Sequence, residues 1–224
     1  MTSSFTLPVP LIDVTVDALV DAPETPAAVL VFAHGAGADM RHAFMSGFAE
    51  RLAARGIAVL RFQFPYAQAG RKAPDRAPKL VATLRAAVAA GAARFPDRPL
   101  VAGGKSMGGR MAAIAAGEPG GLPGTRGMVF AGFPLHAAGK PSTDRAKVLE
   151  SCPLPMLFLQ GDRDRLADPA LLGPVIDRLG DRATRMEISE ADHGFHVPKR
   201  TGLTDADVLD RLADATAAWI RDRS

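Results

Sequence analysis

Ser106 lies in the short run Gly104-Lys105-Ser106-Met107-Gly108, directly after the apolar stretch Val101-Ala102-Gly103. Glycines on both sides of a serine permit the strained strand-to-helix turn that exposes a nucleophilic hydroxyl. At the start of the following helix, the backbone N–H of Met107 can donate a hydrogen bond to a developing oxyanion. The pattern predicts acyl-transfer chemistry at Ser106, and we interpret the adjacent Lys105 as a surface residue of the turn.

A serine hydroxyl becomes reactive when a base takes its proton and a carboxylate holds that base. Both groups follow Ser106 in the order that such a site needs. One predicted strand ends in Gln160-Gly-Asp-Arg-Asp164, and the last predicted strand is followed by Asp192-His193-Gly194. We predict Asp164 as the acid and His193 as the base.

Asp162 and His196 are the alternatives for these two roles. Asp164 is favoured because at Asp162 the chain is still almost within the strand. His193 is favoured because it follows the final strand closely and precedes the flexible Gly194, whereas His196 lies further into the loop.

A second oxyanion donor is expected from the loop His34-Gly-Ala-Gly-Ala38, which follows the first long apolar run. We predict the backbone N–H of Ala36 for this role, with that of Gly37 as the alternative. No Cys/His cluster has zinc spacing, and the predicted reaction needs neither a metal nor an organic cofactor.

Two further side chains are candidates for substrate binding. His136 follows a predicted strand end and could line the pocket, although a structural role is the more usual one for an isolated histidine. Arg110 falls near a helix N-terminus, where the helix dipole does not favour a cation. Arg110, like Arg41 and Arg61, is therefore expected to have a partner, either an aspartate or an anionic group of the substrate. The candidate aspartates are Asp39, Asp162 and Asp192.

Two other motifs compete for the same residues. Gly104-Lys105-Ser106 imitates the end of a phosphate-binding P-loop, but the required first glycine is Pro99. The loop that begins at Gly35 resembles a dinucleotide fingerprint, but its third glycine is replaced by Met40. Both alternatives are therefore rejected.

Apolar strands alternate with amphipathic helices along the chain, which is typical of a mainly parallel sheet covered by helices on both faces. Strands are predicted at 27–33, 57–64, 100–103, 127–132, 156–160 and 185–189. Helices are predicted at 41–55, 75–94, 107–116, 169–179 and 205–221. The segments 67–78, 118–124 and 134–155 are connections too short for a large cap domain, so we expect an open pocket.

The composition is that of an ordinary globular protein. The 224 residues, 47% of them hydrophobic, suffice for one sizeable core, so we expect a single domain over residues 1–224. The net charge is only +3 and no run of consecutive Lys and Arg is present, which argues against nucleic acid as a partner. The apolar runs are too short to span a membrane, the N-terminus does not resemble a signal peptide and the one cysteine cannot form an internal disulfide, so we expect a cytoplasmic protein.

Taken together, these motifs resemble the α/β-hydrolase superfamily, and within it a branch related to dienelactone hydrolases. The resemblance covers nearly the whole chain. It rests on His34-Gly-Ala-Gly-Ala38, Arg61-Phe-Gln-Phe-Pro-Tyr66, Gly104-Lys-Ser-Met-Gly-Gly-Arg110, Gly132-Phe-Pro-Leu-His136, Gln160-Gly-Asp-Arg-Asp164 and Asp192-His193. It implies an eight-stranded sheet and the roles of Ser106, Asp164 and His193 as a triad. It implies no substrate, because dienelactone hydrolases have a cysteine where this chain has Ser106.

The sequence thus predicts a serine hydrolase that cleaves a small ester or thioester. The branch also resembles a scaffold subunit of a chromatin acetyltransferase complex, so the alternative is a non-catalytic interaction module on the same fold. A scaffold has no physical need to retain all three groups of a triad, which favours the enzyme.

Overall fold

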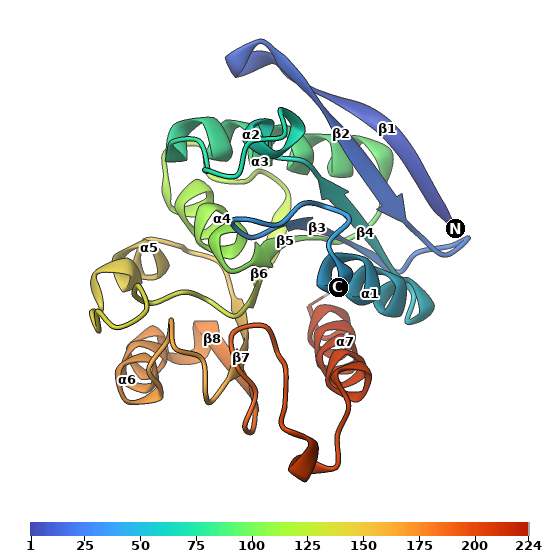
Figure 1. Ribbon diagram of the computed structural model, residues 1–224. Coiled ribbons are helices and arrows are strands. Elements are labelled where there is room, and N and C mark those ends of the chain that lie inside the picture. Colours follow the sequence, from blue (N-terminus) through green and yellow to red (C-terminus); the bar gives the residue numbers. More distant parts are fainter. Residues whose placement is uncertain (224) are drawn as a thin grey trace.

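The structure, a computed structural model, describes residues 1–223 and is built on one twisted sheet of eight strands (Figure 1). The strands are β1 (Thr2–Val9), β2 (Val14–Asp21), β3 (Ala28–Ala33), β4 (Ile57–Phe62), β5 (Leu100–Lys105), β6 (Thr125–Ala131), β7 (Met156–Gly161) and β8 (Ala183–Ile188). Their spatial order is β1-β2-β4-β3-β5-β6-β7-β8. The strands from β4 to β8 in this order pair in parallel, and only β1 and β2 are antiparallel additions at one edge.

Helices cover both faces of the sheet, as the sequence predicts. They are α1 (Ala43–Ala54), α2 (Pro65–Gln68), α3 (Ala77–Arg94), α4 (Met107–Gly117), α5 (Lys147–Glu150), α6 (Pro169–Leu179) and α7 (Asp205–Arg221). Helices α1 and α7 pack together on one face, and α3, α4 and α6 pack on the other. Among residues 1–223 the connections carry only the short helices α2 and α5 and single turns of 3-10 helix, so no large cap domain covers the sheet.

The central strands are apolar on both sides because both of their faces are covered. All six residues of β3 are buried, and they alternate between the two cores. Val29 and Val31 pack beneath α3, whereas Leu30 and Phe32 pack beneath α1. In a parallel sheet of this kind, the loops at the carboxyl ends of the strands meet along one edge, and ligands bind at that edge.

The N-terminal hairpin is the part of the sheet that the residue pattern does not predict. Strands β1 and β2 pair in full register from Thr2 with Asp21 to Val9 with Val14. β1 is mostly exposed, with Leu7 and Val9 as its buried residues. No helix among the described residues is both long and apolar enough to cross a membrane.

Candidate active site

Ser106 stands at the turn between β5 and α4 in a backbone conformation that few non-glycine residues adopt. Its φ of 53° and ψ of −118° are strained for a serine, and such strain concentrates at functional sites. The turn is held by close packing on β3. A Cβ atom at Gly104 would lie 2.6 Å from the Ala33 carbonyl oxygen, and one at Gly108 would lie 2.4 Å from it. Only glycine fits at these two positions, and this packing fixes where the Ser106 hydroxyl stands.

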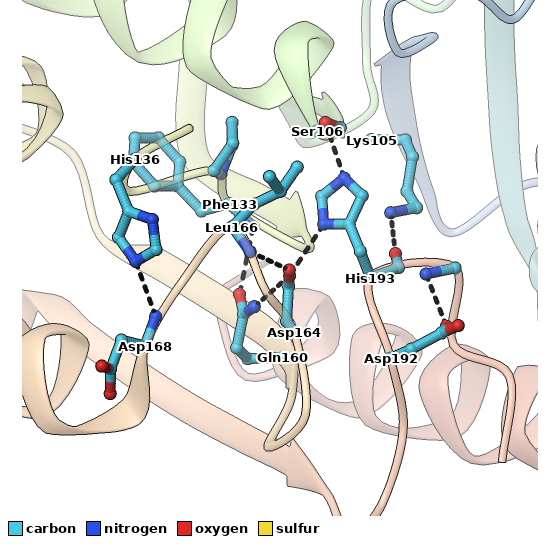
Figure 2. Close-up of polar contacts among 12 residues, drawn as sticks. Lys105, Ser106, Phe133, His136, Gln160, Asp164, Leu166, Asp168, Asp192 and His193 are labelled. Carbon is cyan, nitrogen blue, oxygen red and sulfur yellow. Dashed lines mark hydrogen bonds and ion pairs between the residues drawn. The ribbon is translucent and has the colours of Figure 1, made fainter. Parts of the chain in front are cut away.

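Ser106, His193 and Asp164 form one chain of hydrogen bonds (Figure 2). His193 Nε2 lies 2.8 Å from Ser106 Oγ, and His193 Nδ1 lies 2.8 Å from Asp164 Oδ2. The three side chains come from the loops after β5, β7 and β8, which converge at the carboxyl edge of the sheet. Because Asp164 accepts a hydrogen bond from Nδ1–H, the other ring nitrogen is left as the acceptor that can face a hydroxyl.

Asp164 is buried and held by two further donors. Gln160 Nε2 lies 2.6 Å from Oδ2, and the Leu166 N–H lies 2.8 Å from Oδ1. Gln160 itself accepts a hydrogen bond from the Phe133 N–H through Oε1, so its amide orientation is fixed. Burial alone would raise the pKa of Asp164, but the hydrogen bond and charge of His193, the Leu166 N–H and the Lys105 ammonium together lower it. The carboxyl group is therefore ionised at neutral pH.

Asp162 and His196, the alternatives for acid and base, are bound elsewhere. Asp162 Oδ1 accepts a hydrogen bond from the Glu190 N–H at 2.6 Å, and Oδ2 accepts one from the Ser189 hydroxyl. His196 is exposed and pairs with Asp205 at 3.0 Å. The structure thus brings Asp164 and His193 to Ser106 and leaves the two alternatives apart from it.

The loop after β3 lies directly against the nucleophile. A Cβ at Gly35 would be 3.4 Å from the Ser106 Cβ. The Gly35 carbonyl oxygen accepts hydrogen bonds from His34 Nδ1 at 2.9 Å and from the Tyr66 hydroxyl at 3.3 Å. In a planar trans peptide the next N–H, that of Ala36, points the opposite way. Within residues 1–223, neither the Ala36 N–H nor the Met107 N–H has a hydrogen-bond acceptor.

His34 is a supporting residue that the motif analysis did not single out. It is fully buried, and its Nε2 accepts a hydrogen bond from the Phe64 N–H at 3.1 Å while Nδ1 donates to the Gly35 oxygen. Burial lowers the pKa of His34, and the hydrogen bond to Gly35 only partly offsets that shift. A neutral His34 therefore fixes the loop that carries Ala36. The signal in the sequence was the placement of a histidine at the end of a buried strand.

His136 has the structural contacts that are usual for an isolated histidine, and it also lines a cavity with Asp164 and Asp168. Its Nε2 accepts a hydrogen bond from the Asp168 N–H at 3.0 Å, and its Nδ1 lies 3.0 Å from the Ala137 oxygen (Figure 2). The ring is buried, and both of its nitrogens are used by the main chain. This geometry favours a role in joining the loops after β6 and β7 over a polar contact with substrate.

The expected aspartate partner is found for Arg61 but not for Arg110 among the described residues. Arg61 forms a buried ion pair with Asp21 at 2.6 Å, and not with Asp39, Asp162 or Asp192. Arg110 lies half-buried on the first turn of α4, and its Nε is buried without a hydrogen-bond partner. Burial lowers the pKa of Arg110, and the charge of Arg145 lowers it further. Among the described residues Arg110 has no aspartate partner, and it stays a candidate for binding a substrate anion.

Lys105 is not the surface residue that its place in a turn suggested. Its side chain turns inward from the end of β5, and Nζ donates a hydrogen bond to the main-chain oxygen of His193 (Figure 2). Burial lowers the pKa of Lys105 to about 8, although the charges of Asp164 and Asp192 act in the opposite direction.

An open cavity of about 450 Å³ borders the site on the His193 side. Its lining carries both signs of charge and is formed by Arg163, Arg165, Glu190, Asp192, His193, His196 and Pro198. Such a cavity is large enough for a small organic substrate. Within residues 1–223, no three His, Cys, Asp or Glu side chains come together as a metal site.

Comparison with known proteins places the chain in a family. A family model described as an alpha/beta hydrolase domain matches residues 26–221, so the chain belongs to the α/β-hydrolase family. Its fold is similar to that of a lidless α/β serine hydrolase from Xanthomonas campestris, with 22% identity, a TM-score of 0.76 and coverage of 97% of this chain and 94% of that one. It is also similar to a dienelactone hydrolase from Anabaena variabilis, with 19% identity, a TM-score of 0.79 and coverage of 100% of this chain and 98% of that one. The esterase domain of a Rhodothermus marinus protein is similar too, with 17% identity, a TM-score of 0.74 and coverage of 99% and 98%.

Proposed function

We propose that this chain is a serine hydrolase that cleaves small esters or thioesters through an acyl-enzyme. The observation that carries the proposal is the continuous hydrogen-bonded chain from Ser106 Oγ through both nitrogens of His193 to Asp164. Membership of the α/β-hydrolase family supports the reaction class. Similar structures described as esterases and as a lidless serine hydrolase point in the same direction.

The first half of the reaction forms the acyl-enzyme. Ser106 Oγ attacks the carbonyl carbon while its proton passes to His193 Nε2, and Asp164 stabilises the imidazolium without taking the proton. The new oxyanion accepts hydrogen bonds from the N–H groups of Ala36 and Met107. The bond from carbon to the leaving group then breaks, and His193 gives its proton to the departing alcohol or thiol.

The second half repeats these steps with water. A water molecule gives its proton to His193 and adds to the acyl carbon, and the tetrahedral intermediate then breaks its bond to Ser106 Oγ. His193 Nε2 gives its proton to Ser106 Oγ as that bond breaks, which restores the hydroxyl, and the carboxylic acid leaves. None of these steps calls for a metal or an organic cofactor, because the protein's own groups move every proton and stabilise every charge. The cavity beside His193 is open, so short acyl groups with varied leaving groups are the expected substrates.

The proposal is tested by covalent labelling. The protein is treated with a fluorophosphonate probe, the adduct is located by mass spectrometry, and hydrolysis of aryl acetates and thioacetates is measured in parallel. We expect the adduct on Ser106 and its loss in Ser106→Ala, with hydrolysis reduced by at least about 10⁴-fold. Ser189→Ala, an exposed serine near the same edge, is the matched control and should label normally. Folded wild-type protein that neither labels nor hydrolyses would overturn the proposal and favour an interaction module.

A further inference from the structure

The ammonium group of Lys105 lies beside the candidate active site and has no part in the reaction steps above. Its Nζ donates a hydrogen bond to the main-chain oxygen of His193. The same atom lies 5.5 Å from the ring centre of Phe44 and 5.1 Å from that of Phe195, both within cation–π range. One side chain from the end of β5 therefore contacts the start of α1 and the loop that carries the proposed base.

A glycine at the end of β6 makes room for this arrangement. A Cβ at Gly132 would lie 2.9 Å from Lys105 Nζ and 3.3 Å from His193 Nδ1. Gly132 also has a φ of 64°, in the region that favours glycine. The space for the ammonium and the space for the imidazole therefore depend on the same missing side chain.

The buried ammonium disfavours folding at neutral pH. Within residues 1–223, no carboxylate lies within ion-pair distance of Nζ. Burial lowers the pKa of Lys105 from an ordinary 10.5 to about 8, so the unfolded chain binds this proton more tightly than the folded one. This unfavourable contribution of Lys105 to the free energy of folding is complete below about pH 8 and disappears as the pH rises from about 8 to 10.5. An apolar side chain of the same length would avoid it, so stability does not explain why a lysine stands here.

The loop from 192 to 196 needs an anchor outside itself. Asp192 Oδ1 accepts hydrogen bonds from the N–H groups of Gly194 and His196, and Phe195 adopts a φ of 68°. These contacts fix the shape of the loop, but they do not fix its distance from Ser106. The Arg163 N–H bond to the Ala191 oxygen and the stacking of Phe195 on Phe44 tie the loop to its neighbours, and the bond from Lys105 ties it to the nucleophile turn itself, because Lys105 precedes Ser106 directly in the chain.

We propose that Lys105 is a positioning residue, whose ammonium group ties the main chain of His193 to the nucleophile turn and keeps the imidazole in line between Asp164 and Ser106. The inference rests on the proposed function, since it concerns the geometry of the same reaction. A displacement of about 1 Å in such a site can lower the rate about 10²-fold, so one anchor of this kind has a measurable effect.

The proposal makes activity depend on the charge of Lys105. A neutral amine forms a weaker hydrogen bond than an ammonium group and has no cation–π attraction, so the loop loosens as Lys105 loses its proton. The titratable groups that face Lys105 are Asp164 from the loop after β7 and Asp192 and His193 from the loop after β8. The α1 side contributes the uncharged ring of Phe44. We therefore expect kcat to fall as the pH rises through about 8.

The test compares Lys105→Met with Lys199→Met, which removes the same charge from an exposed position. The rate of Ser106 labelling by a fluorophosphonate, kcat and KM for a neutral aryl acetate, and Tm are measured from pH 6.5 to 9.5. We expect Lys105→Met to lower kcat about 10- to 100-fold with KM nearly unchanged. The Tm of Lys105→Met at pH 7 should not fall below that of the wild type. Its kcat should no longer decline as the pH rises above 8. A lysine with a purely structural role would instead lower Tm and leave the pH profile as it was.

Two further variants keep the test decisive if Lys105→Met does not fold. Lys105→Arg retains a charged donor at all these pH values, so it should recover part of the lost kcat and move the decline to higher pH. Phe44→Leu removes one ring beneath the ammonium, so it should move the decline to lower pH. Wild-type labelling rates and pH profiles in these variants would overturn the role of Lys105 and leave the hydrolase proposal standing. Absence of labelling in the wild type would overturn both.

Discussion

The nucleophile turn and the histidine loop hold the two ends of the same hydrogen bond by different means. The turn at Ser106 is fixed by backbone packing, with two glycines pressed against the Ala33 carbonyl of β3. The loop at His193 is fixed by polar side chains, with Asp164, Asp192 and Lys105 as its anchors. The turn therefore depends on the absence of side-chain atoms, whereas the loop, which also packs against Gly161 and Gly132, depends in addition on particular polar atoms being present.

This difference predicts how each region fails. A change at the turn adds atoms where none fit, so it should damage the fold and the activity together. A change to a polar anchor of the loop removes hydrogen bonds at one edge of a sheet that stays intact, so it should damage activity far more than stability. The predictions that follow test this contrast, beginning with the largest expected effect.

Replacing Asp164 by Asn should separate activity from folding. Asparagine keeps the shape of the side chain but cannot hold the tautomer of His193 or stabilise its charged form, so we expect kcat to fall about 10⁴-fold. The Tm should fall far less than kcat does, because the single oxygen of asparagine can still accept the Leu166 N–H, although Gln160 Nε2 loses its acceptor at Oδ2. Ester hydrolysis and thermal melting followed by circular dichroism give the two quantities.

The matched control is Asp162→Asn on the same loop. Asp162 contacts the Glu190 N–H and not His193, so its replacement should leave kcat within a few-fold of wild type. Equal losses of kcat in the two variants would contradict the assignment of Asp164.

Replacing Gly108 by Ala should act through the fold. The new Cβ would lie 2.4 Å from the Ala33 carbonyl oxygen, which is backbone and cannot move aside. We expect destabilisation of about 1–3 kcal/mol or more, measured by urea unfolding, with activity lost in proportion to the native structure.

Gly173 in α6 supplies the control for this change. Beyond its chain neighbours a Cβ there meets nothing within 4 Å, and the gain in helix propensity is opposed by contact with the ring of the following Pro174, so Gly173→Ala should change stability by less than about 1 kcal/mol. A stable but inactive Gly108→Ala protein would show that the turn is more tolerant than its packing indicates.

The sequence alone predicts most of the sheet and names the three side chains that the structure brings together at the candidate site. Each predicted strand and helix after residue 26 begins and ends within two residues of its observed position. These elements are long, apolar and strongly periodic, so local pattern is enough to define them. The hairpin of β1 and β2 escapes prediction because β1 is an exposed edge strand rich in Ser and Thr, with Pro8 near its end.

The supporting contacts of the site could not be predicted, because they join residues far apart in the chain. Lys105 and the His193 oxygen are 88 positions apart, and His34 and Phe64 are 30 apart. A lysine beside a serine in a turn is normally exposed on the surface. Only the fold shows that the side chain of Lys105 turns inward. For His136 the sequence left a structural role and a place in the pocket open, and only the fold shows that both of its nitrogens bind main chain while the ring lines a cavity.

The smallest predicted effect concerns His34, which supports the turn side of the site from the loop after β3. Its folded-state pKa lies below the ordinary 6.5, so the unfolded chain binds this proton more readily. The contribution of neutral His34 to stability is therefore complete above pH 6.5 and is lost as the pH falls through the lower folded-state value.

His34→Gln keeps a hydrogen-bonding side chain but does not titrate, so its unfolding free energy should decline less between pH 7 and 5 than that of wild type. Denaturant melts at each pH measure this, with His196→Gln as the control, because the pKa of the exposed His196 is raised by Asp205 and its contribution has the opposite sign. Parallel pH dependences in wild type and His34→Gln would mean that the loop carrying Ala36 does not depend on a neutral imidazole.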